Sequence, residues 1–92
     1  MDGNADTHER ITAENLLDRI NGLLADKRPE DAALKALQAD YDGEWWHVAV
    51  QPDKVIQRKL YYYDDLAKVE GILSREGLNV LLVPVRYEPQ AA

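Results

Sequence analysis

Residues 45–63 read WWHVAVQPDKVIQRKLYYY, and this stretch decides the fold that the sequence predicts. Its first six residues are mostly aromatic and β-branched, as β-strands prefer. Pro52-Asp53 is typical of a turn, because proline presets the first turn dihedral and aspartate tolerates the next position. Residues 55–63 alternate well enough to pair back as a second strand. We therefore expect a strand pair that is rich in tryptophan and tyrosine.

A helix and a third strand are predicted to follow this pair. Asp64 or Asp65 is expected to cap the helix, whose apolar stripe is formed by Leu66, Val69, Ile72 and Leu73. Gly77 is well placed to end the helix, with Leu78 packing back as in a Schellman motif. The nearly continuous apolar run from residue 78 to residue 85 then predicts the last strand.

Upstream of residue 45, the pattern predicts a helical hairpin. Thr12 has the character of a helix N-cap, and one face of the first helix is formed by Leu16, Leu17, Ile20, Leu23 and Leu24. Pro29 ends that helix and suits the first turn of another one. The apolar side of the second helix is formed by Ala33, Leu34, Leu37 and Tyr41. This second helix is expected to stop at Asp42-Gly43.

The predicted fold is a single α+β domain over residues 11–88, in which the helical hairpin precedes a ββαβ unit. Residues 1–10 are expected to be a disordered N-terminal tail, and residues 89–92 a C-terminal tail. We prefer the strand order 2-1-3, because the 45–50 strand then takes the protected centre of a three-stranded antiparallel sheet packed on helices. The alternative places the third strand parallel to the second through a right-handed crossover.

Side chains alternate across a strand, so each strand presents two faces. Trp46, Val48 and Val50 are expected to face the helices. The second face of the sheet would then carry an interaction surface formed by Trp45, His47, Lys59, Tyr61, Tyr63, Val80 and Leu82. Aromatic residues on an exposed face are typical of interfaces. Three coverings remain open: the N-terminal hairpin, a second copy of the chain, or another partner.

Composition narrows the function classes. The chain has no cysteine, which excludes disulfides and thiolate chemistry. Its net charge of −6 arises entirely in residues 1–44, which hold 11 acidic and 5 basic side chains. That surplus disfavours nucleic acid as a partner. No apolar run approaches the roughly 20 residues of a membrane span, and no signal peptide is recognisable, so we predict a cytoplasmic protein without membrane contact. No cofactor, metal or catalytic residue is predicted.

The leading hypothesis is therefore a small, acidic, non-enzymatic protein-interaction module, which self-associates as a homodimer through the sheet face or an edge strand. One alternative is a ligand-binding protein or enzyme with a pocket lined by Trp45, His47, Tyr61 and Tyr63. A second alternative is an acidic inhibitor of a basic or nucleic-acid-binding partner, which would use the helical hairpin as its binding element.

Overall fold

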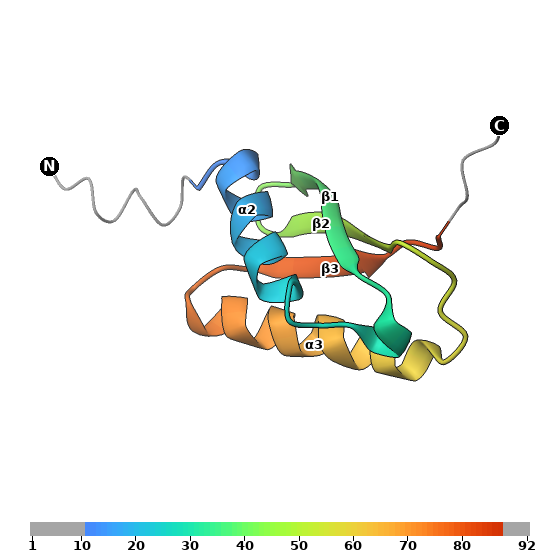
Figure 1. Cartoon of the computed structure of the whole chain (residues 1–92). Helices are drawn as coiled ribbons and strands as arrows, with labels where there is room; N and C mark the ends of the chain where they lie inside the picture. Colours follow the sequence, from blue (N-terminus) through green and yellow to red (C-terminus); the bar gives the residue numbers. More distant parts are fainter. Residues whose placement is uncertain (1–10, 88–92) are drawn as a thin grey trace, which may run out of the picture.

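A computed structural model describes residues 11–87 of the chain. The predicted tails at residues 1–10 and 89–92 lie outside the described residues. The elements follow in the order α2 (Ala13–Leu24), a 3-10 turn η1 (Pro29–Asp31), β1 (Leu34–Tyr41), β2 (Trp46–Pro52), α3 (Lys59–Arg75) and β3 (Val80–Pro84) (Figure 1). They form a small α+β domain with a mixed three-stranded sheet, which confirms the predicted class.

Helix α2 begins as its sequence predicts. Thr12 is the N-cap, and its hydroxyl oxygen accepts a hydrogen bond from the Asn15 amide at 3.1 Å. Leu16, Ile20 and Leu24 are fully buried on one side of the helix. The spacing of these leucine and isoleucine side chains therefore gives the face that packs in the core.

The predicted second helix of the hairpin is wrong, because residues 34–41 form strand β1. This strand pairs antiparallel with β2, from Leu34 opposite Pro52 to Tyr41 opposite Trp46. Asp42 and Gly43 open the turn of a β-hairpin instead of ending a helix, and Gly43 has a φ of 103°. The predicted acidic helical hairpin is consequently absent from residues 11–43.

The predicted strand at residues 55–63 is also wrong, because α3 already begins at Lys59. Its buried stripe is formed by Tyr62, Leu66, Val69 and Leu73. These residues repeat at the helical period, so a helix that includes the three tyrosines buries one continuous apolar stripe against the sheet. Asp64 and Asp65 lie inside the helix and do not cap it.

The C-terminal end of α3 agrees with the prediction. Gly77 has a φ of 86°, which is unfavourable for any residue with a Cβ atom. The Leu78 amide donates to the Leu73 carbonyl at 3.0 Å, and the Gly77 amide donates to the Ser74 carbonyl at 3.0 Å. These two bonds are those of a Schellman motif.

The sheet has the order β1-β2-β3, with β2 in the centre. The central place of the 46–52 strand agrees with the prediction, but the order 2-1-3 is wrong because β1 takes the place of the expected 55–63 strand. Strand β3 pairs parallel to β2, with Trp46 opposite Val80 and Val48 opposite Leu82. Helix α3 forms the crossover between these two strands.

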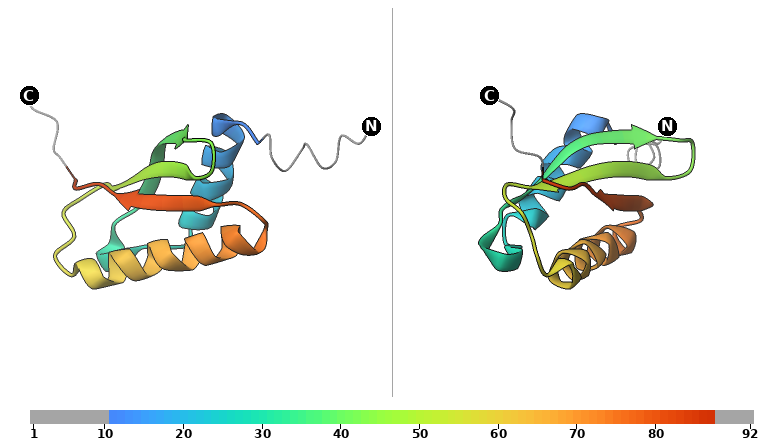
Figure 2. Two further views of the ribbon diagram at one scale, coloured as in Figure 1. Left: turned by 180° about the vertical axis from the view of Figure 1, so that it is seen from behind. Right: turned by 90° about the vertical axis from the view of Figure 1, so that its right-hand side faces the viewer.

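Both helices pack against the same face of the sheet. A single core joins buried residues of α2 and α3 to the inward side chains of all three strands, which are Leu34, Ala36, Val48, Val50, Val80 and Leu82. Figure 2 shows that the other face of the sheet has no helix over it. The fold therefore leaves one side of a three-stranded sheet for other contacts.

Candidate functional site

The helix-free side of the sheet is the first candidate site. Side chains that alternate with the buried ones point to this side, and we call this surface the open face; it consists of Lys35, Gln38, Asp40, His47, Ala49, Gln51, Leu81 and Val83. The part on β1 is polar and carries one cation and one anion. The part on β3 is apolar: it consists of Leu81 and Val83, whose side chains are 41% and 44% exposed.

The predicted interaction surface does not form one face. Trp45 lies in the turn just before β2, and His47 lies on the open face. Tyr61 and Tyr63 are exposed on α3, whose first residue is Lys59.

Val80 and Leu82 are buried in the core, so their predicted exposure is wrong. Strand β3 is apolar on both sides, and the prediction chose the wrong side as the outer one. The parallel register puts Val80 beside Trp46 and Leu82 beside Val48, so these side chains share the inward direction. The outward residues are Leu81 and Val83.

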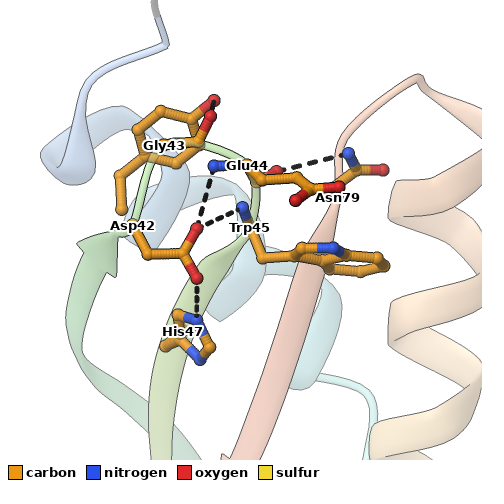
Figure 3. Close-up of polar contacts among 7 residues, drawn as sticks. Asp42, Gly43, Glu44, Trp45, His47 and Asn79 are labelled. Carbon is orange, nitrogen blue, oxygen red and sulfur yellow. Dashed lines mark hydrogen bonds and ion pairs between the residues drawn. The ribbon is translucent and has the colours of Figure 1, made fainter.

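The turn between β1 and β2 is held by the Asp42 carboxylate (Figure 3). Asp42 Oδ1 accepts from the amides of Glu44 and Trp45, both at 2.8 Å, and Asp42 Oδ2 lies 2.8 Å from His47 Nε2. The Trp45 amide, the His47 ring and the Glu44 amide hold the pKa of Asp42 at about 2. The Asp42–His47 contact therefore fixes one side chain of the open face.

The turn is also tied to the start of β3. The Asn79 side chain donates to the Glu44 carbonyl at 3.3 Å, and the Trp46 amide donates to the Asn79 carbonyl at 2.9 Å. Figure 3 shows the Trp45 indole projecting from this turn beside Asn79. The sequence predicts Trp45 on the second face of the sheet with His47, whereas the indole lies in a hollow with residues of α3 and the start of β3. Asn79 carries no sequence pattern of its own, and the sequence predicts no role for it.

Both outer edges of the sheet are occupied by side chains from the helices. On β1, the Asn21 amide group accepts from the Ala36 N–H at 2.8 Å and donates to the Ala36 carbonyl at 3.3 Å. On β3, the Glu70 carboxylate accepts from the Leu82 N–H at 2.7 Å. Pro84, two residues further, has no N–H to offer. These features block strand addition at the points where they occur.

The second candidate site is a cavity of about 330 Å³ at the carboxyl ends of the parallel strands, where Tyr63 forms part of the wall. Trp45 lines a different hollow, between α3 and β3. Because Tyr63 and Trp45 line separate cavities, the predicted pocket shared by Trp45, His47, Tyr61 and Tyr63 does not form.

Within residues 11–87, no three His, Asp or Glu side chains gather closely enough to hold a metal ion. No helix in that range is long and apolar enough to cross a membrane. Comparisons of the chain with protein-family models, with curated proteins and with solved structures found no match.

Proposed function

We propose that the chain is a non-enzymatic interaction module that forms a homodimer through its open face. The observation that carries this proposal is the apolar strip of Leu81 and Val83 on a sheet face without a helix. Exposed apolar groups that lie side by side gain free energy when a second surface removes them from water. A domain of this size also buries comparatively little surface alone.

The charges of the open face favour a second copy as the occupant. Lys35 and Asp40 lie near opposite ends of β1, while the net charge of the whole chain is −6. A twofold axis that runs between the two faces, parallel to both sheets and perpendicular to their strands, makes the facing strands antiparallel. Lys35 of each copy then meets Asp40 of the other, and the two β3 strips meet each other. The face is thus self-complementary, as a twofold interface requires.

The edge strands of the sheet are less suited to dimer formation than its open face. Asn21 already bonds both backbone groups of Ala36 on β1, and Glu70 occupies the Leu82 N–H on β3. A partner strand would have to displace these side chains. We therefore favour contact between faces over continuation of the sheet.

The small area of the face sets the expected affinity. Three strands about 4.8 Å apart and about five residues long cover roughly 250 Å². Stable interfaces bury about 800 Å² per partner. Even with contacts from residues around the face, the dimer should be weak, with a dissociation constant on the order of 100 µM.

Sedimentation velocity from 5 µM to 1 mM tests this proposal. We expect a rapid monomer–dimer equilibrium in the wild type and a monomer for Val83→Lys, since a charge would enter the apolar strip. Leu60→Lys is the matched control, because Leu60 is exposed on α3 and lies outside the open face. It should dimerise like the wild type.

The pair Lys35 and Asp40 gives a second test. Lys35→Asp and Asp40→Lys should each weaken the dimer, and the double variant should restore it. A wild-type monomer at 1 mM, or equal loss in Val83→Lys and Leu60→Lys, would contradict the proposal.

A further inference from the structure

The cavity of about 330 Å³ lies at the end of the sheet opposite Trp45. It is formed where β2 and β3 end and α3 begins, and its apolar walls come from Val55, Ile56, Tyr62, Tyr63, Pro84 and Tyr87. The volume falls at the lower end of the range for small-molecule sites, which are lined mainly by apolar and aromatic groups. Figure 1 shows the first turn of α3 and the tip of β3 at the same end of the molecule.

The wall made by the segment after β3 is held in place by the strands and by α3. The Val85 amide donates to the Val50 carbonyl at 2.8 Å, and the Gln51 side chain donates to the Arg86 carbonyl at 3.0 Å. The Tyr62 hydroxyl lies 2.5 Å from the Val50 carbonyl oxygen and 3.3 Å from that of Val85. The site is therefore built before any ligand arrives, which lowers the entropy cost of binding.

Two stacked tyrosine rings form the aromatic side of the cavity. The rings of Tyr62 and Tyr63 have centroids 5.8 Å apart and planes 26° apart, and both residues line the space. The Tyr62 hydroxyl is engaged by the two carbonyls, so its ring contributes mainly an apolar surface. An aromatic ring of a ligand can pack against such rings in the offset or edge-to-face arrangements that aromatic groups prefer.

The charges of the cavity are opposite to those of the whole chain. Lys59 and Arg86 line it, and none of its described lining residues is acidic. The chain nevertheless carries a net charge of −6. Two cations facing one apolar space in an acidic protein favour an anion there, and the Arg86 guanidinium is suited to a carboxylate or phosphate.

We propose that this cavity binds a small planar anion, namely an aromatic ring that carries a carboxylate or a phosphate group. The ring lies against the tyrosine wall, and the anionic group lies between Lys59 and Arg86. This site is separate from the proposed dimer interface, because no residue that lines the cavity belongs to the open face, although Gln51 of that face bonds the Arg86 carbonyl.

Amide NMR spectra recorded during titration provide the test. The probes are naphthalene-2-carboxylate, 1-naphthyl phosphate and the neutral naphthalene-2-carboxamide. At least one anion should bind with a dissociation constant of about 1 mM, as expected for a ligand of this size. The amide should bind at least about fivefold more weakly. Shift changes should centre on Val55, Tyr63 and Tyr87, and the anion that binds more tightly identifies the preferred group.

Variants distinguish binding through the two cations from non-specific hydrophobic binding. Arg86→Gln and Lys59→Gln should each weaken the anion about five- to tenfold and leave the weak binding of the amide unchanged. Arg75→Gln is the matched control, since it removes the same kind of charge at the far end of α3, and it should bind like the wild type. Equal binding of amide and anions, shifts centred on Leu81 and Val83, or an equal loss in Arg75→Gln would overturn the proposal.

Discussion

Replacing Tyr62 by phenylalanine removes one hydroxyl group that joins α3 to the ends of two strands. This hydroxyl lies 2.5 Å from the Val50 carbonyl oxygen and 3.3 Å from the Val85 carbonyl oxygen, and the side chain is 4% exposed. Val50 keeps its bond from the Val85 amide at 2.8 Å, whereas the Val85 carbonyl loses its bond to the hydroxyl. The variant therefore tests how firmly the cavity wall is anchored.

The expected cost follows from these contacts. A net hydrogen bond contributes about 1 kcal/mol, and a buried acceptor left without a donor costs about 1–3 kcal/mol. Since only one of the two carbonyls loses its donor, we expect Tyr62→Phe to lower the free energy of unfolding by about 1.5 kcal/mol. For a domain of this size, that lowers the Tm by about 6–12 °C.

The effect should also depend on alkaline pH. Burial raises the pKa of Tyr62 to about 12, above the value of about 10 for an unfolded tyrosine. The folded state thus keeps a proton that the unfolded state releases. The wild type therefore loses stability as the pH rises from 10 to 12, and the difference between wild type and Tyr62→Phe shrinks over the same interval.

Urea unfolding at pH 7 and pH 11.5, followed by circular dichroism, measures both effects. A spectrophotometric titration should show one tyrosine with a raised pKa, absent in Tyr62→Phe. Tyr61→Phe is the matched control, because Tyr61 is the preceding residue of α3 and is exposed. Equal stability losses in the two variants, or a high-pKa tyrosine that persists in Tyr62→Phe, would refute this account of the anchor.

Three further predictions concern the turns and one sheet edge. Gly77→Ala should lower the free energy of unfolding by about 1 kcal/mol, because Gly77 has a φ of 86°. Gly71→Ala within α3 should instead raise it by about 0.5–1 kcal/mol, and thermal unfolding that shifts both Tm values in the same direction would contradict this. Asp42→Asn should be less stable than the wild type at pH 7, and the difference should fade toward pH 2. The lowered pKa of Asp42 stabilises the fold at pH values above the unfolded-state pKa of about 3.9, and urea midpoints from pH 2 to 7 measure the difference. Asn21→Leu should cost about 1–2 kcal/mol and speed hydrogen exchange at the Ala36 amide more than at the amides of β2, and uniform acceleration would count against a local edge contact.

The elements that the sequence predicts correctly carry local signals. The Thr12 hydroxyl bonds the Asn15 amide, and Gly77 with Leu78 closes α3, as expected from the residue types alone. Strand β2 also agrees, because its alternating aromatic and β-branched residues fit only one buried face. At Thr12 and Gly77, the interaction that decides the structure lies within a few residues along the chain.

Strand β1 was missed because Ala, Leu, Lys and Gln at residues 33–38 favour a helix by intrinsic preference. Contacts distant in sequence overrule that preference, including the Asn21 side chain on Ala36 and the whole ladder to β2. A usable signal was nevertheless present. Asp42-Gly43 just before an aromatic strand predicts a hairpin more strongly than the helix stop assigned to it.

The start of α3 was missed for a related reason. Three consecutive tyrosines favour a strand by preference, but Tyr62 continues the stripe of Leu66, Val69 and Leu73 by one helical turn. Extending that period backward would have placed the helix correctly. The outward side of β3 could not be obtained in this way, because Leu81 and Leu82 are equally apolar and only the parallel register to β2 distinguishes them.

The parallel pairing of β2 and β3 has a consequence for synthesis on the ribosome. Strand β1 lies next to β2 in sequence, so this hairpin can form as soon as both have emerged. Strand β3 is made only after the whole of α3, so until then the side of β2 that will pair with β3 has no partner strand. Unpaired strand edges invite association between chains. The nascent chain is therefore most vulnerable to aggregation after the β1–β2 hairpin has left the ribosome and before β3 has joined it, so slow release of β3 should lower the yield of folded protein.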